Sequence, residues 1–434
     1  MRILPLILVS TFCSCVPIIA QISKPEKRII KSVDSNNAEA LKFLKEVTNI
    51  NSGSMNFEGV KKVGTIFREK FDALGFETKW VEGVSFQRSG HLIATHQGSS
   101  NGPKLLLIGH LDTVFEPDSP FQEYKMVNDS IMKGPGVVDM KGGDVIIIYA
   151  LKALKESRLL DKMNIEVVMT GDEEKSGSPL ELARKDLIAA ADRADIAIGF
   201  ENGDSNPRTA VVSRRGAAGW ELFVTGTPAH SSQIFSERIG SGAIYEASRI
   251  LTAFHEELSS EQYLTFNPGV MLGGTSVDYD PAKDGGSSYG KSNIVAKQAI
   301  VKGDIRAVSP EQLERAKKVM REIVQKNYPQ TSATIKFSNN TYPPLAPSEG
   351  NNELLSIYDK ASQDLGFGPV TAVHPINAGA ADVSFTSGRV DKAIDGLGLS
   401  GGKDHTIEEY GNIEMLPVLT KRAAVFLYRL TSSK

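Results

Sequence analysis

The chain has little cysteine, little net charge and no apolar run long enough to cross a membrane. Its 434 residues include only two cysteines, Cys13 and Cys15, and carry a formal net charge of −3. Cysteine confined to the N-terminus excludes a disulfide framework, so a sizeable hydrophobic core must stabilise the fold. The weak acidic balance, together with the lack of a basic tract with interleaved aromatic residues, excludes the electrostatic footprint of a nucleic-acid binder. We therefore expect no nucleic-acid partner.

The N-terminal segment resembles an export signal. Arg2 supplies an early positive charge, an apolar run follows over residues 3–12, and the segment ends on Ala20, which suits signal peptidase. The apolar run is shorter than the roughly 20 residues that a membrane span needs. We therefore predict a signal peptide over residues 1–20, no membrane span, and export to the periplasm or the medium. The alternative is lipid attachment at Cys15, which would make the protein a lipoprotein.

Apolar patterns along the rest of the chain predict an α/β protein with an inserted domain. Short apolar runs at 105–108, 165–169 and 196–198 alternate with helical segments, which is typical of a mostly parallel sheet flanked by helices. From about Ser213 the order becomes strand, helix, two strands, helix and strand. That order suits an inserted four-stranded α+β domain that serves as a lid and for dimerisation. Helix and strand alternate again after the proline-rich stretch at 343–347.

The catalytic domain is therefore expected to be discontinuous. We predict that residues 21–212 and 339–434 form it together, and that residues 213–338 form the lid.

Potential metal ligands follow the ends of several predicted strands. In chain order they are His110, Glu173, Glu174, Glu201 and His405, and Asp139 lies in a glycine-rich loop just before a helix. In open α/β sheets the ligand crevice lies beyond the carboxyl ends of the strands, so these side chains are expected to converge. Histidines and carboxylates without a thiol suit zinc, cobalt or manganese, and a bridging carboxylate would hold two ions. Asp112, two residues beyond His110, is placed to orient its imidazole.

Each of these residues also has an ordinary structural role open to it. A pair such as Glu173 and Glu174 after a strand is more often a solvated edge or a charge at a helix N-terminus. Asp139, beside glycines, equally suits a helix cap or a turn. The joint placement at strand ends favours a metal centre, because independent structural roles would not require it.

The segments that carry these residues resemble one family of zinc peptidases, which comprises glutamate carboxypeptidase (carboxypeptidase G), aminoacylase and succinyl-diaminopimelate desuccinylase. They are residues 109–115, 136–143, 171–174 and 401–405, and the resemblance extends over nearly all of the chain beyond the signal, including the order of elements in the lid. It implies that His110, Asp139 and Glu201 hold one zinc ion. Asp139, Glu174 and His405 would hold a second, so that Asp139 bridges the two. Glu173 would be the general base.

The same resemblance implies roles for three residues of the lid. His230 matches a family histidine that reaches the active site of the partner subunit, where it would stabilise the oxyanion. Asn293 and Arg306 match positions that contact substrate. The alternatives are that His230 caps a helix region of its own lid and that Arg306 is a surface charge. Because the edges of the lid sheet must be covered or paired, we expect a homodimer formed through the lid.

The sequence thus predicts a zinc-dependent metallopeptidase that cleaves a peptide or N-acyl amide bond next to a free carboxylate, like a glutamate carboxypeptidase. The alternative enzyme is an N-acyl-amino-acid deacylase or a dipeptidase, with the same chemistry on a differently shaped substrate. The alternative outside catalysis is an exported metal- or peptide-binding protein. Glu173 argues against that class, because a binder needs no free base beside its metal. Residues 338–342 contain no arginine where the glutamate-selective relative places one, so the preferred side chain stays open.

Overall fold

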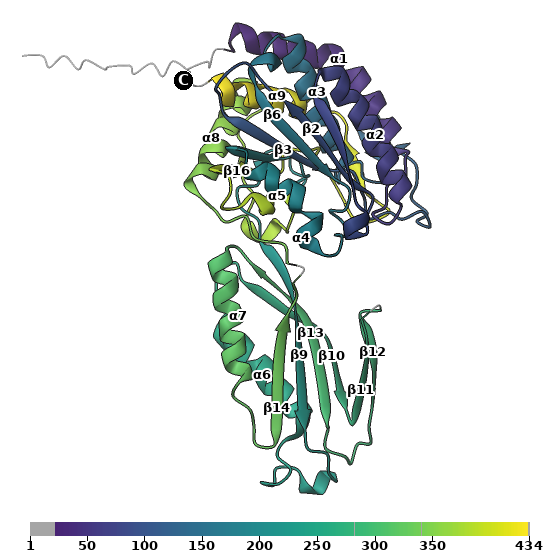
Figure 1. Ribbon diagram of the computed structural model, residues 1–434, viewed down its shortest axis with the longest axis vertical. Coiled ribbons are helices and arrows are strands. Elements are labelled where there is room, and N and C mark those ends of the chain that lie inside the picture. The colour runs from purple at the N-terminus through teal and green to yellow at the C-terminus, as the bar shows by residue number, and fades with distance from the viewer. Residues whose placement is uncertain (1–21, 282, 340, 433–434) are drawn as a thin grey trace, which may run out of the picture.

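The computed structural model describes residues 22–281, 283–339 and 341–432. The predicted signal peptide, with Cys15, lies outside the described residues. Figure 1 shows two bodies: a larger one with helices around a sheet, and an elongated one that extends away from it. None of the helices in the described part of the chain has both the length and the apolar composition that a membrane crossing requires.

The larger body is built on a six-stranded sheet with the order β1-β2-β6-β3-β7-β16. Its strands are β1 (Glu77–Glu82), β2 (Gly90–His96), β3 (Lys104–His110), β6 (Asn164–Thr170), β7 (Ile196–Gly199) and β16 (Lys392–Ile394). Strands β6, β3, β7 and β16 run parallel, whereas β1 and β2 form an antiparallel edge. The prediction of a mostly parallel sheet is confirmed, and the antiparallel edge adds to it.

Helices cover both faces of this sheet (Figure 1). They are α1 (Lys24–Thr48), α2 (Phe57–Leu74), α3 (Lys141–Glu156), α4 (Leu180–Ala183), α5 (Lys185–Ala191), α8 (Glu349–Asp364) and α9 (Met415–Ser432). Successive side chains of a strand point to opposite faces, so β3 contributes to two cores. Leu105 and Leu107 join the core under α1, α3 and α9, while Leu106 and Ile108 join the core under α5. The apolar run at 105–108 is therefore buried on both faces.

The smaller body, which we call the lid, contains a four-stranded antiparallel sheet with the order β10-β13-β9-β14. Its elements are β9 (Gly216–Gly226), α6 (Gly242–Leu258), β10 (Thr265–Gly274), β13 (Gln298–Ala307), α7 (Pro310–Val324) and β14 (Thr331–Phe337). Both helices pack on one face of the sheet, where Trp220, Phe254 and Val301 share a buried core. The predicted α+β lid is confirmed. A hairpin of β11 (Ser276–Asp280) and β12 (Gly285–Tyr289), which the sequence did not indicate, separates β10 from β13.

Short elements in the connections complete the fold. The strands are β4 (Lys125–Met126), β5 (Ile131–Lys133), β8 (Thr209–Ala210), β15 (Thr371–Ala372), β17 (Gly401–Gly402) and β18 (Tyr410–Asn412). The 3-10 helices are η1 (Val84–Phe86), η2 (Leu160–Lys162), η3 (Ser231–Gln233), η4 (Pro375–Asn377) and η5 (Asp382–Thr386). Pairing of β18 with both β17 and β5 brings the loop after β17 beside the loop after β5. The first loop carries His405, and the second carries Asp139.

The register of the parallel strands places the loops of the site at one edge. His110 is the register partner of Thr170, and Ile108 is the partner of Gly199. The residues that follow β6 and β7 therefore emerge next to His110. This is the convergence that the strand-end positions predict.

Two crossing segments join the lid to the larger body. Arg214 pairs with Leu345 and Ala217 pairs with Tyr342 in isolated antiparallel bridges at the start of β9. Strand β9 has 11 residues. At a rise of about 3.3 Å per residue, its far end lies roughly 35 Å from the connection. The lid thus projects well away from the sheet of the larger body (Figure 1).

Candidate metal centre

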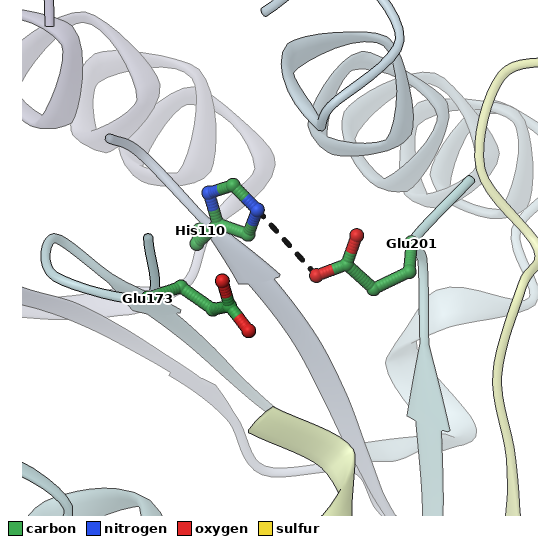
Figure 2. Close-up of side chains that lie close together, drawn as sticks. All are labelled: His110, Glu173 and Glu201. Carbon is green, nitrogen blue, oxygen red and sulfur yellow. Dashed lines mark ion pairs between the residues drawn. The ribbon is translucent and has the colours of Figure 1, made fainter. Parts of the chain in front are cut away.

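His110, the last residue of β3, faces one carboxylate from the loop before α3 and another from the end of the neighbouring strand β7. Its Nε2 atom lies 3.1 Å from Oδ1 of Asp139 and 3.4 Å from Oε1 of Glu201. Figure 2 shows Glu201 extending toward the imidazole from the end of β7, with Glu173 beside it from the loop after β6. His110, Glu173 and Glu201 each offer a donor atom within 4.8 Å of the other two.

His405 lies on the other side of Asp139. Its Nε2 atom is 3.1 Å from Oδ2 of Asp139 and 3.2 Å from Oε2 of Glu174. The two oxygens of Asp139 therefore face two different histidines, each of which also faces a glutamate. A carboxylate that bridges two metal ions needs this placement. The structure thus brings together all six residues that the sequence singled out around the proposed ions.

The donors fit two divalent cations in chemistry as well as in position. Oε1 of Glu174 is buried and has no hydrogen-bond partner among the described residues. Burial and the nearby Asp139 raise the pKa of Glu174 to about 7, and burial and Glu201 raise the pKa of Glu173 well above its usual range. Hydrogen bonds to Asp139 and Glu174 raise the pKa of His405 to about 11. Crowded carboxylates of this kind are stabilised by positive charge, which bound cations would supply.

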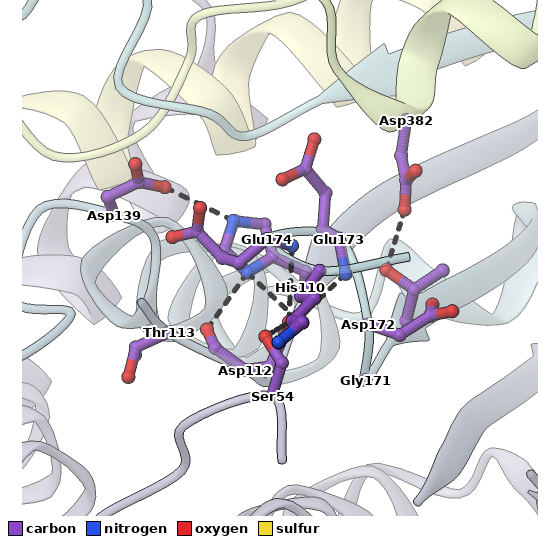
Figure 3. Close-up of polar contacts among 12 residues, drawn as sticks. Ser54, His110, Asp112, Thr113, Asp139, Gly171, Asp172, Glu173, Glu174 and Asp382 are labelled. Atoms are coloured by element: carbon purple, nitrogen blue, oxygen red, sulfur yellow. Dashed lines mark hydrogen bonds and ion pairs between the residues drawn. The ribbon is translucent and has the colours of Figure 1, made fainter. Parts of the chain in front are cut away.

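Asp112 positions both His110 and the loop that carries Glu173 and Glu174 (Figure 3). Its Oδ1 and Oδ2 accept hydrogen bonds from the backbone N–H groups of Glu173 and Glu174, at 3.0 Å and 3.1 Å. Nδ1 of His110 lies 3.1 Å from the main-chain oxygen of Asp112 and 3.5 Å from its Oδ1. The nearer acceptor for the imidazole is therefore the carbonyl rather than the expected carboxylate. Ser54 donates a further bond of 2.6 Å to Asp112.

A buried glutamate that the sequence did not single out fixes the Asp139 loop. The carboxylate of Glu409 accepts hydrogen bonds from the backbone N–H groups of Gly136, Val138 and Asp139, at 3.2, 2.9 and 3.2 Å. Burial raises the pKa of Glu409 to about 8. The peptide bond between Asp139 and Met140 is cis. The orientation of the bridging carboxylate thus depends on a residue 270 positions away in the chain.

A buried arginine supports the loop that carries Glu173. Arg184 donates to Oδ1 of Asp172 at 2.6 Å, to Oδ1 of Asp382 at 2.7 Å and to the hydroxyl of Tyr342 at 2.6 Å. The Tyr342 hydroxyl in turn donates to the main-chain oxygen of Glu173 at 3.1 Å. Arg184 is fully buried. It therefore links the Glu173 loop both to η5 and to the segment that leaves the lid.

A second buried ion pair supports Glu201. Oδ1 of Asp395 accepts from the backbone N–H of Glu201 at 3.2 Å, and Oδ2 accepts from Nε of Arg214 at 2.7 Å. Arg214 also donates to the main-chain oxygen of Gly379 at 2.9 Å. No local pattern in the sequence marks Asp395 or Arg214, because their partners are distant in the chain.

The lid residues predicted to reach the site do not lie together. His230 and Asn293 are beyond the far end of β9, where the N–H of Ser231 donates to the Asn293 carbonyl at 2.8 Å. Nδ1 of His230 accepts from the N–H of Ser232 at 3.3 Å, so the imidazole caps η3. Arg306 is at the opposite end of the lid, 3.0 Å from Asp304. Within one chain, therefore, only Arg306 lies at the end of the lid nearest the metal centre.

The fold and the clustered donors define the class of a two-metal hydrolase. Residues 106–429 match the family described as Peptidase family M20/M25/M40, and the chain therefore belongs to this family. Members are hydrolases, and the predicted resemblance is confirmed.

Similar proteins extend over almost the whole chain. Carboxypeptidase G2 from Pseudomonas sp. (strain RS-16) is 25% identical over 418 residues, which cover 95% of this chain and 94% of that protein. The solved structure of a tripeptidase from Staphylococcus aureus has a TM-score of 0.68 and 21% identity, and covers 92% of this chain and 99% of its own. A dinuclear metal-binding M20 peptidase from Bacillus subtilis has a TM-score of 0.62 and 16% identity, and covers 92% of this chain and 100% of its own.

Proposed function

We propose that this chain is an exported zinc carboxypeptidase that hydrolyses a small peptide or an N-acyl amino acid at the amide bond next to a free carboxylate. The observation that carries the proposal is the placement of Asp139. One of its oxygens faces His110 and the other faces His405, while the carboxylate of Glu173 lies in the same crevice. Similarity to Carboxypeptidase G2 over 95% of the chain supports the choice among peptidase types.

The residues divide into ligands and a base. His110, Asp139 and Glu201 would hold one ion, and Asp139, Glu174 and His405 would hold the other. When bound, the ions polarise the scissile carbonyl and acidify a water molecule. Glu173 takes a proton from the attacking water and gives it to the leaving nitrogen. Burial and the nearby Glu201 raise the pKa of Glu173 well above its usual range, so this carboxylate holds a proton more readily than an exposed glutamate does.

Arg306 supports the choice of a substrate with a free carboxylate. Its guanidinium lies close to Gly379, in the loop of the larger body that precedes η5. The neighbouring Arg214 also contacts this loop through the Gly379 carbonyl. A planar guanidinium is suited to bidentate recognition of a carboxylate.

Matched substrates test this specificity. We expect hydrolysis of N-acyl amino acids and of N-blocked dipeptides with a free C-terminus, and no hydrolysis of the same dipeptides with an amidated C-terminus. A panel that varies the C-terminal residue then shows whether glutamate is preferred. A second candidate is a peptidase that requires a free N-terminus, since the solved structures with this fold include an aminopeptidase. Cleavage of C-amidated peptides, with loss of activity when the N-terminus is blocked, would establish that candidate instead.

The proposed active form is a homodimer paired through the lid. The lid sheet ends on β10 and β14. Near β10, Phe235, Ile244, Tyr245 and Met271 are exposed apolar side chains, and the rings of Phe235 and Tyr245 contact each other at 5.6 Å. An exposed apolar group beside a sheet edge favours association. Because β9 carries His230 away from its own metal centre, we assign His230 to the metal centre of the partner subunit.

Mixing two inactive variants tests this assignment. His230→Ala and Glu173→Gln proteins are combined under conditions that exchange subunits. A hybrid dimer has one site with neither defect, so roughly a quarter of wild-type activity should return, half of the dimers being hybrids with one intact site each. No recovery despite demonstrated exchange would mean that His230 acts within its own chain or not at all.

Export is proposed from the N-terminal sequence alone. We expect the mature protein to begin near Gln21, and N-terminal sequencing of protein from a bacterial envelope or medium measures this. A cytoplasmic protein that keeps Met1 would contradict export, and a lipidated Cys15 at the N-terminus would establish the lipoprotein alternative.

A further inference from the structure

The turn that carries His405 also carries an acidic side chain, that of Asp404. Lys403 and His405 have φ angles of 58° and 59°, in the left-handed region. The turn is closed by Thr406, whose N–H and hydroxyl both donate to the carbonyl of Lys403, at 3.2 Å and 2.7 Å. In an extended strand, neighbouring side chains would point to opposite sides. In this turn, Asp404 and His405 both lie beside Asp139.

Asp404 lies within reach of the metal centre and has no other partner. A carboxylate oxygen of Asp404 and a ring nitrogen of His405 lie within 4.8 Å of each other and of an oxygen of Asp139. No hydrogen bond or ion pair involves the Asp404 carboxylate in the part of the chain that the structure describes. Oε1 of Glu174, whose other carboxylate oxygen lies 3.2 Å from Nε2 of His405, is buried and also has no hydrogen-bond partner among the described residues. Asp404 and Glu174 thus both have unused acceptor oxygens near His405.

We propose that Asp404 is a fourth protein ligand of the ion held by Asp139, Glu174 and His405. Ligand oxygens lie about 2.0–2.2 Å from a zinc ion, so two ligands of one ion can be about 4 Å apart. The Asp404 oxygen lies within 4.8 Å of donor atoms of Asp139 and His405, so a small movement of the turn brings it into that range. Asp404 is exposed and lies in a short turn, so such a movement disturbs no core packing.

The additional ligand makes the two positions chemically different. The ion beside His405 then has three carboxylates and one imidazole, whereas the ion beside His110 has two carboxylates and one imidazole. Carboxylate oxygens suit manganese, while imidazole suits zinc. The position with Asp404 is therefore the one that retains Mn²⁺ better. This inference rests on the proposed metal centre and assigns it a residue beyond the shared ligand set.

Metal titration of an Asp404→Asn variant tests the inference against a matched control. The control is Glu408→Gln, which removes an exposed carboxylate from the same loop, where it pairs with Lys133 on the surface. Metal-free proteins are titrated with Mn²⁺ and with Zn²⁺ in competition with a chromophoric chelator. We expect Asp404→Asn to lower the affinity for one of the two ions by roughly tenfold or more, and to lower the affinity for Mn²⁺ more than that for Zn²⁺. Glu408→Gln should bind both ions like the wild type.

Each outcome has a defined meaning. Wild-type affinity for both ions in Asp404→Asn overturns the inference. Equal weakening in both variants also overturns it, because it would reflect the general loss of negative charge. A wild-type protein that binds no ion would overturn the metal centre itself, so the two failures are distinguishable. Unfolding of the metal-free variants at the wild-type temperature confirms that neither change alters the fold.

Discussion

Replacement of Arg184 by methionine should destabilise the larger body strongly. Arg184 is fully buried between the carboxylates of Asp172 and Asp382, to which it donates at 2.6 Å and 2.7 Å. Methionine fills much of the volume but leaves both carboxylates without their cation. Breaking a buried ion pair in this way costs about 3–5 kcal/mol. Asp172 keeps a hydrogen bond from the N–H of Gly177, and Asp382 keeps one from the hydroxyl of Thr170. We therefore expect the free energy of unfolding to fall by about 3 kcal/mol, the lower end of this range.

Urea unfolding of the metal-free proteins measures this loss, with Arg193→Met as the matched control. Arg193 pairs with Glu166 through the same guanidinium chemistry, but its side chain is 56% exposed. An exposed pair contributes less than about 1 kcal/mol, so the control should unfold almost like the wild type. Equal, small losses in the two variants would refute the claim that the Arg184 network stabilises the loop that carries Glu173.

Two further predictions concern residues outside the ligand set. Glu409→Gln places an amide donor against backbone donors of the Asp139 loop, so metal affinity should fall about 10- to 100-fold without loss of any ligand, as chelator competition would show. The pKa of Glu26 is lowered, because hydrogen bonds from Ser23 and Arg429 outweigh its burial. The ionised Glu26 carboxylate therefore stabilises the folded protein at pH values above the unfolded pKa of about 4.3. This stabilisation is lost as the pH falls through the lower pKa that Glu26 has in the folded protein. The urea midpoints of the wild type and Glu26→Gln should therefore differ at pH 7 and converge as the pH falls through the lowered pKa of folded Glu26. A difference that grows in acid would contradict this sign.

The elements that a sequence can predict are those with a strong local pattern. The runs at 105–108 and 165–169 predict buried strands, and because parallel strands end at one edge, His110 and the Glu173 loop could be placed together without coordinates. The amphipathic helices of the lid follow in the same way from their periodicity.

Features that depend on long-range contacts could not be predicted. The β11–β12 hairpin lies in a stretch rich in glycine and serine, so its propensity indicates a loop although cross-strand pairing forms a ribbon. Glu409 and Asp395 act through partners 270 and 194 positions away, and no local spacing marks such contacts. Arg184 lies between two short helices, where an arginine is ordinarily exposed. The buried partners make it an exception.

Metal content and turnover, measured on the same samples of Glu173→Gln and Asp139→Asn, test the central claim most directly. The account assigns Glu173 to proton transfer and Asp139 to both ions. Glu173→Gln should therefore bind two ions per chain, like the wild type, while turnover falls by about 10²–10⁴-fold or more. Asp139→Asn should lose metal and activity together. Retention of activity by Glu173→Gln, or loss of its ions with Asp139→Asn still loaded, would contradict the account.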